Sequence, residues 1–308
     1  MTGQSYDLTR VCGPDAEGMT VKGVLRRDAG VSRRLMRSII HGEKDDAGNP
    51  GDEAGGVFVN GARARFADRV KTGDVIGLVY PRETTYMQPE DIPLEILYED
   101  EDLLALNKQP GIVVHPTKGH PSGTVANGIA RYMAERGEAY RPRFVNRLDM
   151  DTSGVLLIGK NAHVQNAFAA QAGRGETVKK YLVCVSGIVE ADEGVIDLPI
   201  APDDEGSPRR VVRGDGAPSV TRFKVLSRKP IDAAYTALEV TIETGRTHQI
   251  RVHFSHLGHP VLGDSLYGSE SALTRQVLHA RSLEFTHPRT GERLKIIAPL
   301  PGDIYAFF

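Results

Sequence analysis

The stretch RFVNRLDMDTSGVLLIGK, residues 143–160, joins an apolar strand to a cluster of charged side chains. Residues 155–158 form an unbroken apolar run between two glycines, which is typical of a short buried strand. Arg147, Asp149 and Asp151 stand immediately before that strand. An arginine and two carboxylates at the mouth of a buried strand need a reason, because charge near a protein interior is costly unless it is paired.

Length and composition restrict the class of protein that this sequence can encode. The 308 residues include 40% apolar and 25% charged ones, as in an ordinary soluble globular protein, and this length favours about two domains. No apolar run approaches the ~18 residues of a membrane span, and the first residues lack a secretion-signal pattern. Cys12 and Cys184 are too few for a disulfide framework or a four-cysteine zinc site. We expect a cytoplasmic protein with reduced thiols that does not enter a membrane.

The chain divides into four expected segments: a loose tail over 1–15, a small domain over 16–80, a linker over 81–93 and a larger domain over 94–308. Apolar positions within 20–40 predict two short helices broken at Gly30, with Ser32 as N-cap of the second. Asn60-Gly61 predicts a hairpin turn, and the acidic stretch 43–56 predicts a loop.

The larger domain alternates short strands with two helices, near 123–135 and 161–173. Strands dominate and hairpin-type spacings are frequent. This pattern predicts an α+β fold with a mainly antiparallel mixed sheet flanked by helices.

Basic side chains are concentrated in the small domain, although the whole chain has a net charge of −2. Outside the acidic loop, residues 20–75 hold ten basic and three acidic side chains. Arg26, Arg33 and Arg37 would share a face if the helical phase continued, with Arg34 beside them. A solvated helix face is one interpretation, and a platform that contacts phosphates is the other.

Asp151-Thr152-Ser153-Gly154 looks like the turn of an aspartic protease. That chemistry needs two carboxylates sharing a proton, hence two such turns or a small homodimeric subunit, and this chain has one turn at an unsuitable length. A lone aspartate such as Asp149 is commonly an Asx-turn or cap residue.

Metal, nucleotide and thiol chemistry are not indicated. His248, His253, His256 and His259 lack the His-x3-His spacing of a zinc-binding helix, so we expect hydrogen-bonded structural roles for them. Cys184 lies in an apolar strand, where a reactive thiolate is disfavoured. No phosphate-binding loop or dinucleotide fingerprint is present. We therefore predict no metal and no cofactor, and chemistry by side chains alone.

Five ordered segments over residues 94–300 resemble motifs of the RluA/RluD-type pseudouridine synthases. They are LLALNKQPGIVVHP (103–116), NRLDMDTSGVLLIGKN (146–161), KKYLVCVSG (179–187), TGRTHQIRVHFSHLGHPVLGDSLYG (244–268) and LHARSLEFTHP (278–288). The basic small domain resembles the S4-type RNA-binding module that many of these enzymes carry. The resemblance implies the pseudouridine synthase fold with an added S4-like domain.

The same resemblance implies roles for individual residues. Asp149 matches the catalytic aspartate, and Arg147 matches the arginine that fills the gap left by the extruded nucleotide. Tyr181 matches the tyrosine that packs on the target base and takes part in proton transfer. Arg246 matches the basic residue that pairs with the aspartate. Asn146 departs from the family, since most relatives have histidine there.

The implied reaction converts uridine to pseudouridine after the base is flipped out of the RNA. The aspartate could attack C1′ or assist removal of the 2′ proton, and the sequence leaves both routes open. We expect a monomer that acts on structured RNA, with large-subunit ribosomal RNA as first choice and transfer RNA as alternative. Phosphates would be contacted by Arg26, Arg33, Arg34 and Arg37. The rival from another class is a non-catalytic RNA-binding factor of ribosome assembly.

Overall fold

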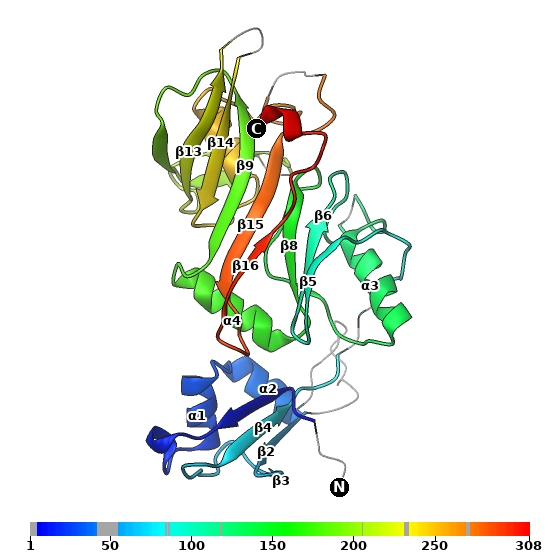
Figure 1. Cartoon of the computed structure of the whole chain (residues 1–308), viewed down its shortest axis with the longest axis vertical. Coiled ribbons are helices and arrows are strands. Elements are labelled where there is room, and N and C mark those ends of the chain that lie inside the picture. Colours follow the sequence, from blue (N-terminus) through cyan, green and yellow to red (C-terminus); the bar gives the residue numbers. More distant parts are fainter. Residues whose placement is uncertain are drawn as a thin grey trace.

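The computed structural model describes residues 5–41, 55–83, 85, 87–117, 119–204, 206–230, 234–268 and 272–308. The N-terminal domain is a four-stranded antiparallel sheet of order β1-β4-β2-β3 with two helices packed against it (Figure 1). Its elements are β1 (Leu8–Val11), α1 (Val21–Asp28), α2 (Arg33–His41), β2 (Gly56–Val59), β3 (Ala62–Arg63) and β4 (Val75–Val79), with a 3-10 turn at Pro14–Ala16. The acidic loop expected over 43–56 falls almost entirely outside the described residues.

Both predicted helices of this domain are confirmed, and local hydrogen bonds explain their limits. Thr20 caps α1, since its hydroxyl accepts from the backbone N–H of Gly23 at 3.1 Å. Gly30 then adopts a φ of +62°, a left-handed conformation that glycine takes without penalty, and separates the helices. Ser32 begins α2 by accepting from the N–H of Leu35 at 3.1 Å.

The predicted loose tail is wrong over residues 8–11. These residues form β1, which pairs antiparallel with β4 and places Leu8 opposite Leu78. Leu8 and Cys12 are 6% and 2% exposed and belong to the domain's core. The strand escaped notice because most of its side chains are exposed and its stability comes from backbone pairing, which leaves no apolar alternation to read. The hairpin turn at Asn60-Gly61 is confirmed, with φ of +51° and +82°.

The larger domain is built on a ten-stranded sheet. Eight of its strands follow the order β10-β13-β14-β9-β15-β8-β6-β5, and the other two pair at its side, β16 with β15 and β7 with β8. Among the described strands only β8 and β15 run parallel. The predicted α+β class with a mainly antiparallel mixed sheet is confirmed. The elements are β5 (Ile96–Glu99), β6 (Leu103–Lys108), α3 (Val125–Arg136), β7 (Arg143–Phe144), β8 (Ser153–Gly159), α4 (Ala162–Gly173), β9 (Val178–Ser186), β10 (Glu193–Asp197), β11 (Ile200–Pro202), β12 (Arg210–Val212), β13 (Val220–Lys229), β14 (Tyr235–Ile242), α5 (Gln249–His256), β15 (Leu278–Thr286), β16 (Arg293–Ile297) and a 3-10 turn at Tyr305–Phe307.

Strand β8 and strand β15 approach each other closely at the mouth of β8. Gly154 has a φ of +111°, and a Cβ at this position would lie 2.2 Å from the carbonyl oxygen of Ala280. No other residue fits there without moving the backbone. Beside it the hydroxyl of Ser153 hydrogen-bonds Nδ1 of His279 at 2.9 Å. The turn that precedes β8 is thereby held against the sheet.

The segment 81–93 runs along the larger domain. Glu83 forms a two-pronged ion pair with Arg143 of β7, and the side chains are only 13% and 8% exposed. Further on, the side-chain amide of Asn127 in α3 donates to the carbonyl of Gln88 at 2.9 Å. In the part of the chain that the structure describes, no helix is long and apolar enough to cross a membrane.

Candidate active site

Asp149 lies in the turn between β7 and β8, where its carbonyl accepts from the N–H of Thr152 at 3.1 Å. Its side chain is 20% exposed and lines two adjoining cavities. We call the cavity of about 680 Å³ that Arg34 also lines the outer cavity, and the cavity of about 360 Å³ that Tyr181 also lines the inner cavity. The Oδ2 atom of Asp149 accepts a hydrogen bond from Nη1 of Arg251 at 2.9 Å. The carboxylate is thus held by a cation at one oxygen, while the side chain still borders open space.

Arg251 is buried on α5 and lies between two carboxylates. Its Nε and Nη2 donate to the two oxygens of Asp264 at 2.7 and 2.9 Å, and Asp264 is fully buried. Burial opposes the charge on Arg251, but the hydrogen bonds and charges of Asp264 and Asp149 outweigh it and raise its pKa above the ordinary value. Burial likewise opposes the charge on Asp264, but the Arg251 guanidinium lowers its pKa overall. The Arg251 guanidinium that binds Asp149 is therefore permanently charged, and Asp264 fixes its position.

The expected pairing of Asp149 with Arg246 is wrong. Arg246 is exposed, and its Nε donates to the carbonyl of Pro218 at 3.2 Å. The reason is where helix α5 begins. The side chain of Gln249 accepts a hydrogen bond from the backbone N–H of Arg246 at 3.0 Å and closes the turn that precedes the helix. Arg246 therefore lies before α5, whereas Arg251 lies within it. Arg246 still borders the inner cavity. A helix predicted over 249–256 would have singled out Arg251, its one arginine, inside the same motif.

Tyr181 projects from β9 into the inner cavity, which Asp149 also lines. Its side chain is 7% exposed. Burial, and then the charge of Asp149, raise the pKa of the Tyr181 hydroxyl above its ordinary value. The hydroxyl is consequently protonated at neutral pH.

Arg147 stands at the mouth of the site, exposed and lining both cavities. The structure thus brings Arg147, Asp149 and Tyr181 to one place, as the sequence predicted. The neighbouring Asn146 braces β8 by donating to the carbonyl of Val155 at 2.9 Å and accepting from the N–H of Leu157 at 2.7 Å. Asn146, which differs from the histidine of most relatives, therefore still forms hydrogen bonds with β8.

His248 borders the carboxylate and was not predicted as a site residue. It has a φ of +58°, which is unusual for a residue with a side chain and is found mostly where the surroundings enforce it. Its Nδ1 hydrogen-bonds the hydroxyl of Tyr267 at 2.8 Å, and its Nε2 lies 3.9 Å from Oδ2 of Asp149. Burial lowers the pKa of His248, and Arg251 adds to this against the opposing charge of Asp149. The imidazole faces the carboxylate mainly in its neutral form at pH 7.

Lys108 hydrogen-bonds the turn that carries Asp149, and the sequence did not predict this role. It is 1% exposed, and its Nζ donates to the carbonyls of Gln109, Met150 and Thr152 at 2.8, 2.7 and 3.0 Å. Burial lowers the pKa of Lys108 to about 7, although the neighbouring carboxylates oppose that shift. Three carbonyl acceptors match the three N–H groups of an ammonium ion, so the side chain ties the end of β6 to the turn.

Of the other three histidines of this motif, His253 and His259 have hydrogen-bond partners, whereas His256 is exposed and its structural role stays a prediction. His253 contacts the hydroxyl of Thr221 and the carbonyl of Leu198, both at 2.9 Å, and Nδ1 of His259 contacts the carbonyl of Ser186 at 2.9 Å. Across the described residues, no three His, Cys, Asp or Glu side chains are grouped to hold a metal ion. Burial raises the pKa of the Cys184 thiol to about 12.

The four arginines that the sequence singled out in the N-terminal domain are divided between two helices. Arg26 belongs to α1, whereas Arg33, Arg34 and Arg37 belong to α2, and the break at Gly30 ends the continuous helical phase. All four are exposed. Of the four, Arg34 alone lines the outer cavity that leads to Asp149.

Comparison with known proteins adds the decisive observation. The family described as RNA pseudouridylate synthase matches residues 102–256, which include the Asp149 turn, β9 and α5. The chain belongs to this family. It is an RNA pseudouridine synthase, an isomerase that acts on uridine within RNA.

Relatives of this RNA pseudouridine synthase cover most of its length. The Bacillus subtilis protein described as "Uncharacterized RNA pseudouridine synthase YjbO" is 37% identical over 93% of this chain and 97% of its own. "Ribosomal large subunit pseudouridine synthase D" of Xanthomonas campestris is 37% identical over 82% of this chain and 80% of its own. The solved structure "Human RNA Pseudouridylate Synthase Domain Containing 1" superposes with a TM-score of 0.58 at 27% identity, covering 71% of this chain and 90% of that one. The predicted pseudouridine synthase fold is confirmed.

Proposed function

We propose that this enzyme converts specific uridines of large-subunit ribosomal RNA to pseudouridine, with Asp149 as the catalytic carboxylate. The target RNA is suggested by similarity to the Xanthomonas protein, whose description names the large ribosomal subunit. The observation that carries the catalytic assignment is the Asp149 carboxylate. One oxygen is hydrogen-bonded to Arg251, and the side chain borders the cavity that Tyr181 also lines.

The reaction breaks the bond between N1 and C1′ and makes a bond between C5 and C1′. A uracil stacked in a helix is out of reach, so it would be flipped into the inner cavity at a cost of a few kcal/mol. Arg147, exposed at the cavity mouth, would fill the space that the base leaves. Asp149, held in place by its ion pair with Arg251, would attack C1′ or assist removal of the 2′ proton.

Tyr181 would complete the reaction at the base. After C5 bonds to C1′, C5 carries a proton that must leave. Because burial keeps the Tyr181 hydroxyl protonated, it would work as a relay: its oxygen would receive the proton from C5 while its own proton passes to water in the cavity. Arg246 would contact RNA at the cavity edge, since Arg251 already holds the aspartate.

The N-terminal domain would act as an S4-like RNA-binding module, and the whole enzyme as a cytoplasmic monomer. The exposed arginines Arg26, Arg33, Arg34 and Arg37 support phosphate contacts. A transfer RNA substrate is the alternative. The family match and the cavity that Asp149 and Tyr181 share argue against the non-catalytic assembly factor.

Pseudouridine mapping in cells with and without this gene tests the proposal. We expect sites in large-subunit ribosomal RNA that disappear with the gene and return with the wild-type protein but not with Asp149→Asn. Sites that disappear only from transfer RNA would establish the alternative substrate. Unchanged pseudouridine throughout would contradict the proposed function.

A further inference from the structure

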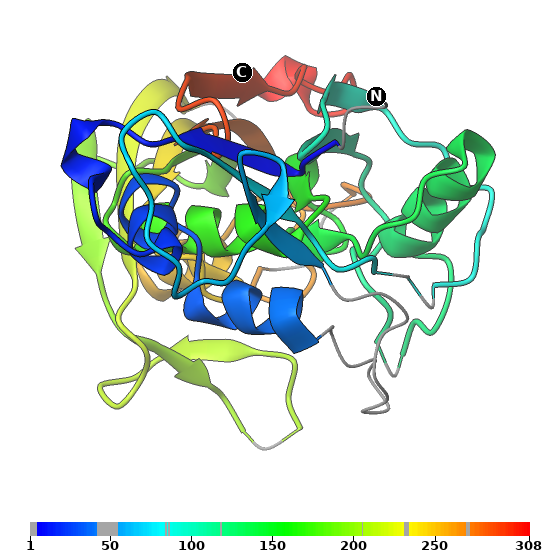
Figure 2. The same ribbon diagram turned by 90° about the horizontal axis from the view of Figure 1, so that it is seen from below.

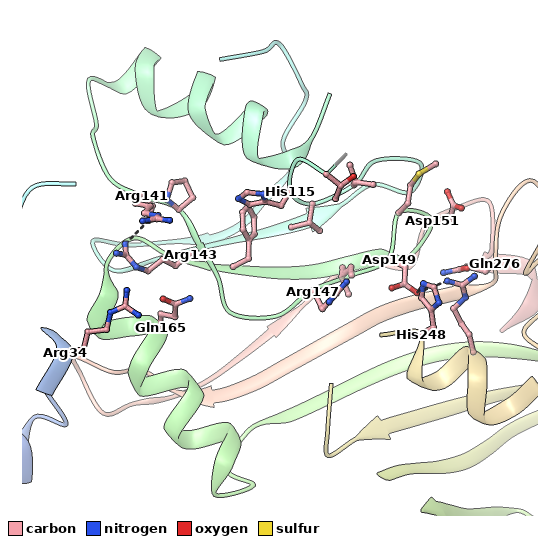
Figure 3. A pocket seen from close by; sticks show the side chains of 18 residues that line it. Arg34, His115, Arg141, Arg143, Arg147, Asp149, Asp151, Gln165, His248 and Gln276 are labelled. Carbon is pink, nitrogen blue, oxygen red and sulfur yellow. Dashed lines mark hydrogen bonds and ion pairs between the residues drawn. The ribbon is translucent and has the colours of Figure 1, made fainter. Parts of the chain in front are cut away.

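The outer cavity is shared between the two domains of the protein. Figure 3 shows Arg34 and Gln165 at one end, Asp149 and His248 at the other, and Arg147 between them. Arg34 belongs to the N-terminal domain, and the remaining walls belong to the larger domain. A single trough of about 680 Å³ therefore leads from the N-terminal domain to the catalytic carboxylate.

The end of this trough near the domain boundary is basic, and it also offers an aromatic surface. Arg34 and Arg141 are exposed at this end and Arg147 is exposed between the two ends, whereas the carboxylates of the trough are at the Asp149 end. The exposed ring of His115 lies edge-on to Phe144, with 5.9 Å between ring centroids. Guanidinium groups bind phosphates, and aromatic rings stack on unpaired bases, so this combination suits a single RNA strand better than a protein surface.

The N-terminal domain is held in place by contacts with the larger domain. Ser32, the N-cap of α2, also accepts a hydrogen bond from the amide of Asn166 in α4 at 3.1 Å. Tyr80 lies against the ring of His163 with 6.4 Å between centroids, and Ala162 packs against the N-terminal core. Figures 1 and 2 both show the N-terminal domain against α4. These contacts set the position of Arg34, two residues after Ser32, relative to the active site.

We propose that one RNA strand lies along this trough, with the target uridine at Asp149 and a phosphate several nucleotides away at Arg34. This inference rests on the proposed function and adds to it a binding path that crosses the domain boundary. The docked N-terminal domain would then select uridines that lie at a set distance along an unpaired strand. Arg33, which does not line the trough, would meet only a larger folded RNA.

Oligouridylates of about 4 to 16 nucleotides test this path, because known single-strand binding sites span that range. Arg34→Glu and Arg33→Glu are matched variants: the residues are adjacent and exposed, and the charge change is the same. We expect Arg34→Glu to weaken binding of the longest oligouridylate about tenfold and to lower the log–log salt slope by about 0.7 or more. Arg33→Glu should weaken it less than about threefold by the same phosphate-contact argument. Tetrauridylate, filling only the Asp149 end, should distinguish neither variant from wild type.

Equal losses in the two variants, or an Arg34→Glu loss that does not depend on RNA length, would overturn the inference. A parallel assay separates it from the proposed function: single-turnover pseudouridine formation on ribosomal RNA from cells lacking the gene. Failure of the wild-type protein there would contradict the target RNA. The length-dependent difference between the variants would still establish the RNA path.

Discussion

The two ends of the outer cavity are built in opposite ways. At the Asp149 end each key group has a partner from a distant segment: Arg251 on the carboxylate, Lys108 on the turn carbonyls, and Asp264 behind Arg251. At the Arg34 end the guanidinium is exposed and makes no hydrogen bond or ion pair to another described residue.

The difference agrees with the roles that we propose for the two ends. A reacting carboxylate must be held in position before the substrate arrives, which requires buried partners. A phosphate-binding arginine contributes by exchanging water and counterions for the RNA backbone, so its charge must remain available. Substitutions at the Asp149 end should therefore abolish chemistry, whereas those at the Arg34 end should change affinity and salt dependence.

The largest expected effect is at Asp149. Asp149→Asn keeps the shape but can act neither as nucleophile nor as base, so single-turnover pseudouridine formation should fall by at least about a thousandfold. RNA affinity should change little, because most of it comes from phosphate contacts. Asp151→Asn is the control and should retain most activity. Substantial turnover by Asp149→Asn would remove the aspartate from the mechanism, and loss of RNA binding together with turnover would point to a structural aspartate.

Arg251 and Arg246 offer the next contrast. Arg251→Met leaves Asp149 and Asp264 without their cation, which should cost on the order of 3–5 kcal/mol of unfolding free energy and lower turnover about a hundredfold through misplacement of the carboxylate. Arg246→Met, at an exposed position, should change stability by less than about 0.5 kcal/mol. Chemical denaturation and single-turnover kinetics measure both effects. If Arg246→Met proved the more damaging, the pairing seen in the structure would not be the working one.

His279 lies beside the start of β8, and its titration should make the free energy of unfolding depend on pH. Burial lowers its pKa to about 4, against about 6.5 in an unfolded chain. Between these values the unfolded chain binds a proton that the native protein does not, so stability is greatest above pH 6.5 and falls as the pH drops to 4. The loss attributable to His279 is about 3 kcal/mol.

His279→Gln removes this titration. Denaturation of the wild type and the variant at several pH values between 7.5 and 4 should show a shallower decline for the variant. Parallel declines would mean that other groups account for the acid sensitivity.

The smallest effect is expected in the N-terminal domain. Replacing Arg26, Arg33 and Arg37 with glutamine in one triple variant should reduce the log–log salt slope for ribosomal RNA binding by up to about 2.7, since each of the three phosphate contacts contributes about 0.7–0.9. Turnover at saturating RNA should stay within about twofold of wild type, because phosphate contacts position the RNA without taking part in chemistry. An unchanged slope would show that these arginines form only a solvated surface.

Much of the local structure could be predicted from neighbouring residues. The two helices at Gly30, the Ser32 cap and the Asn60-Gly61 turn are confirmed, because caps and turns depend on residues a few positions apart. Strand β1 was missed because its pairing with β4 is set by the backbone of a segment more than sixty residues away. Helix α5 was missed because its short sequence carries a mixed apolar and charged pattern.

The sequence by itself determined the chemistry available to this protein: an aspartate at the mouth of a buried strand, a tyrosine in a later strand, and arginines in a small N-terminal domain. The tertiary structure decided which of these groups meet. It paired Asp149 with Arg251 instead of Arg246, and it placed Arg34 alone of four exposed arginines on the path to the active site. The physical reason is that an ion pair acts over only a few ångströms. Which charges come that close depends on where helices begin and how the domains pack.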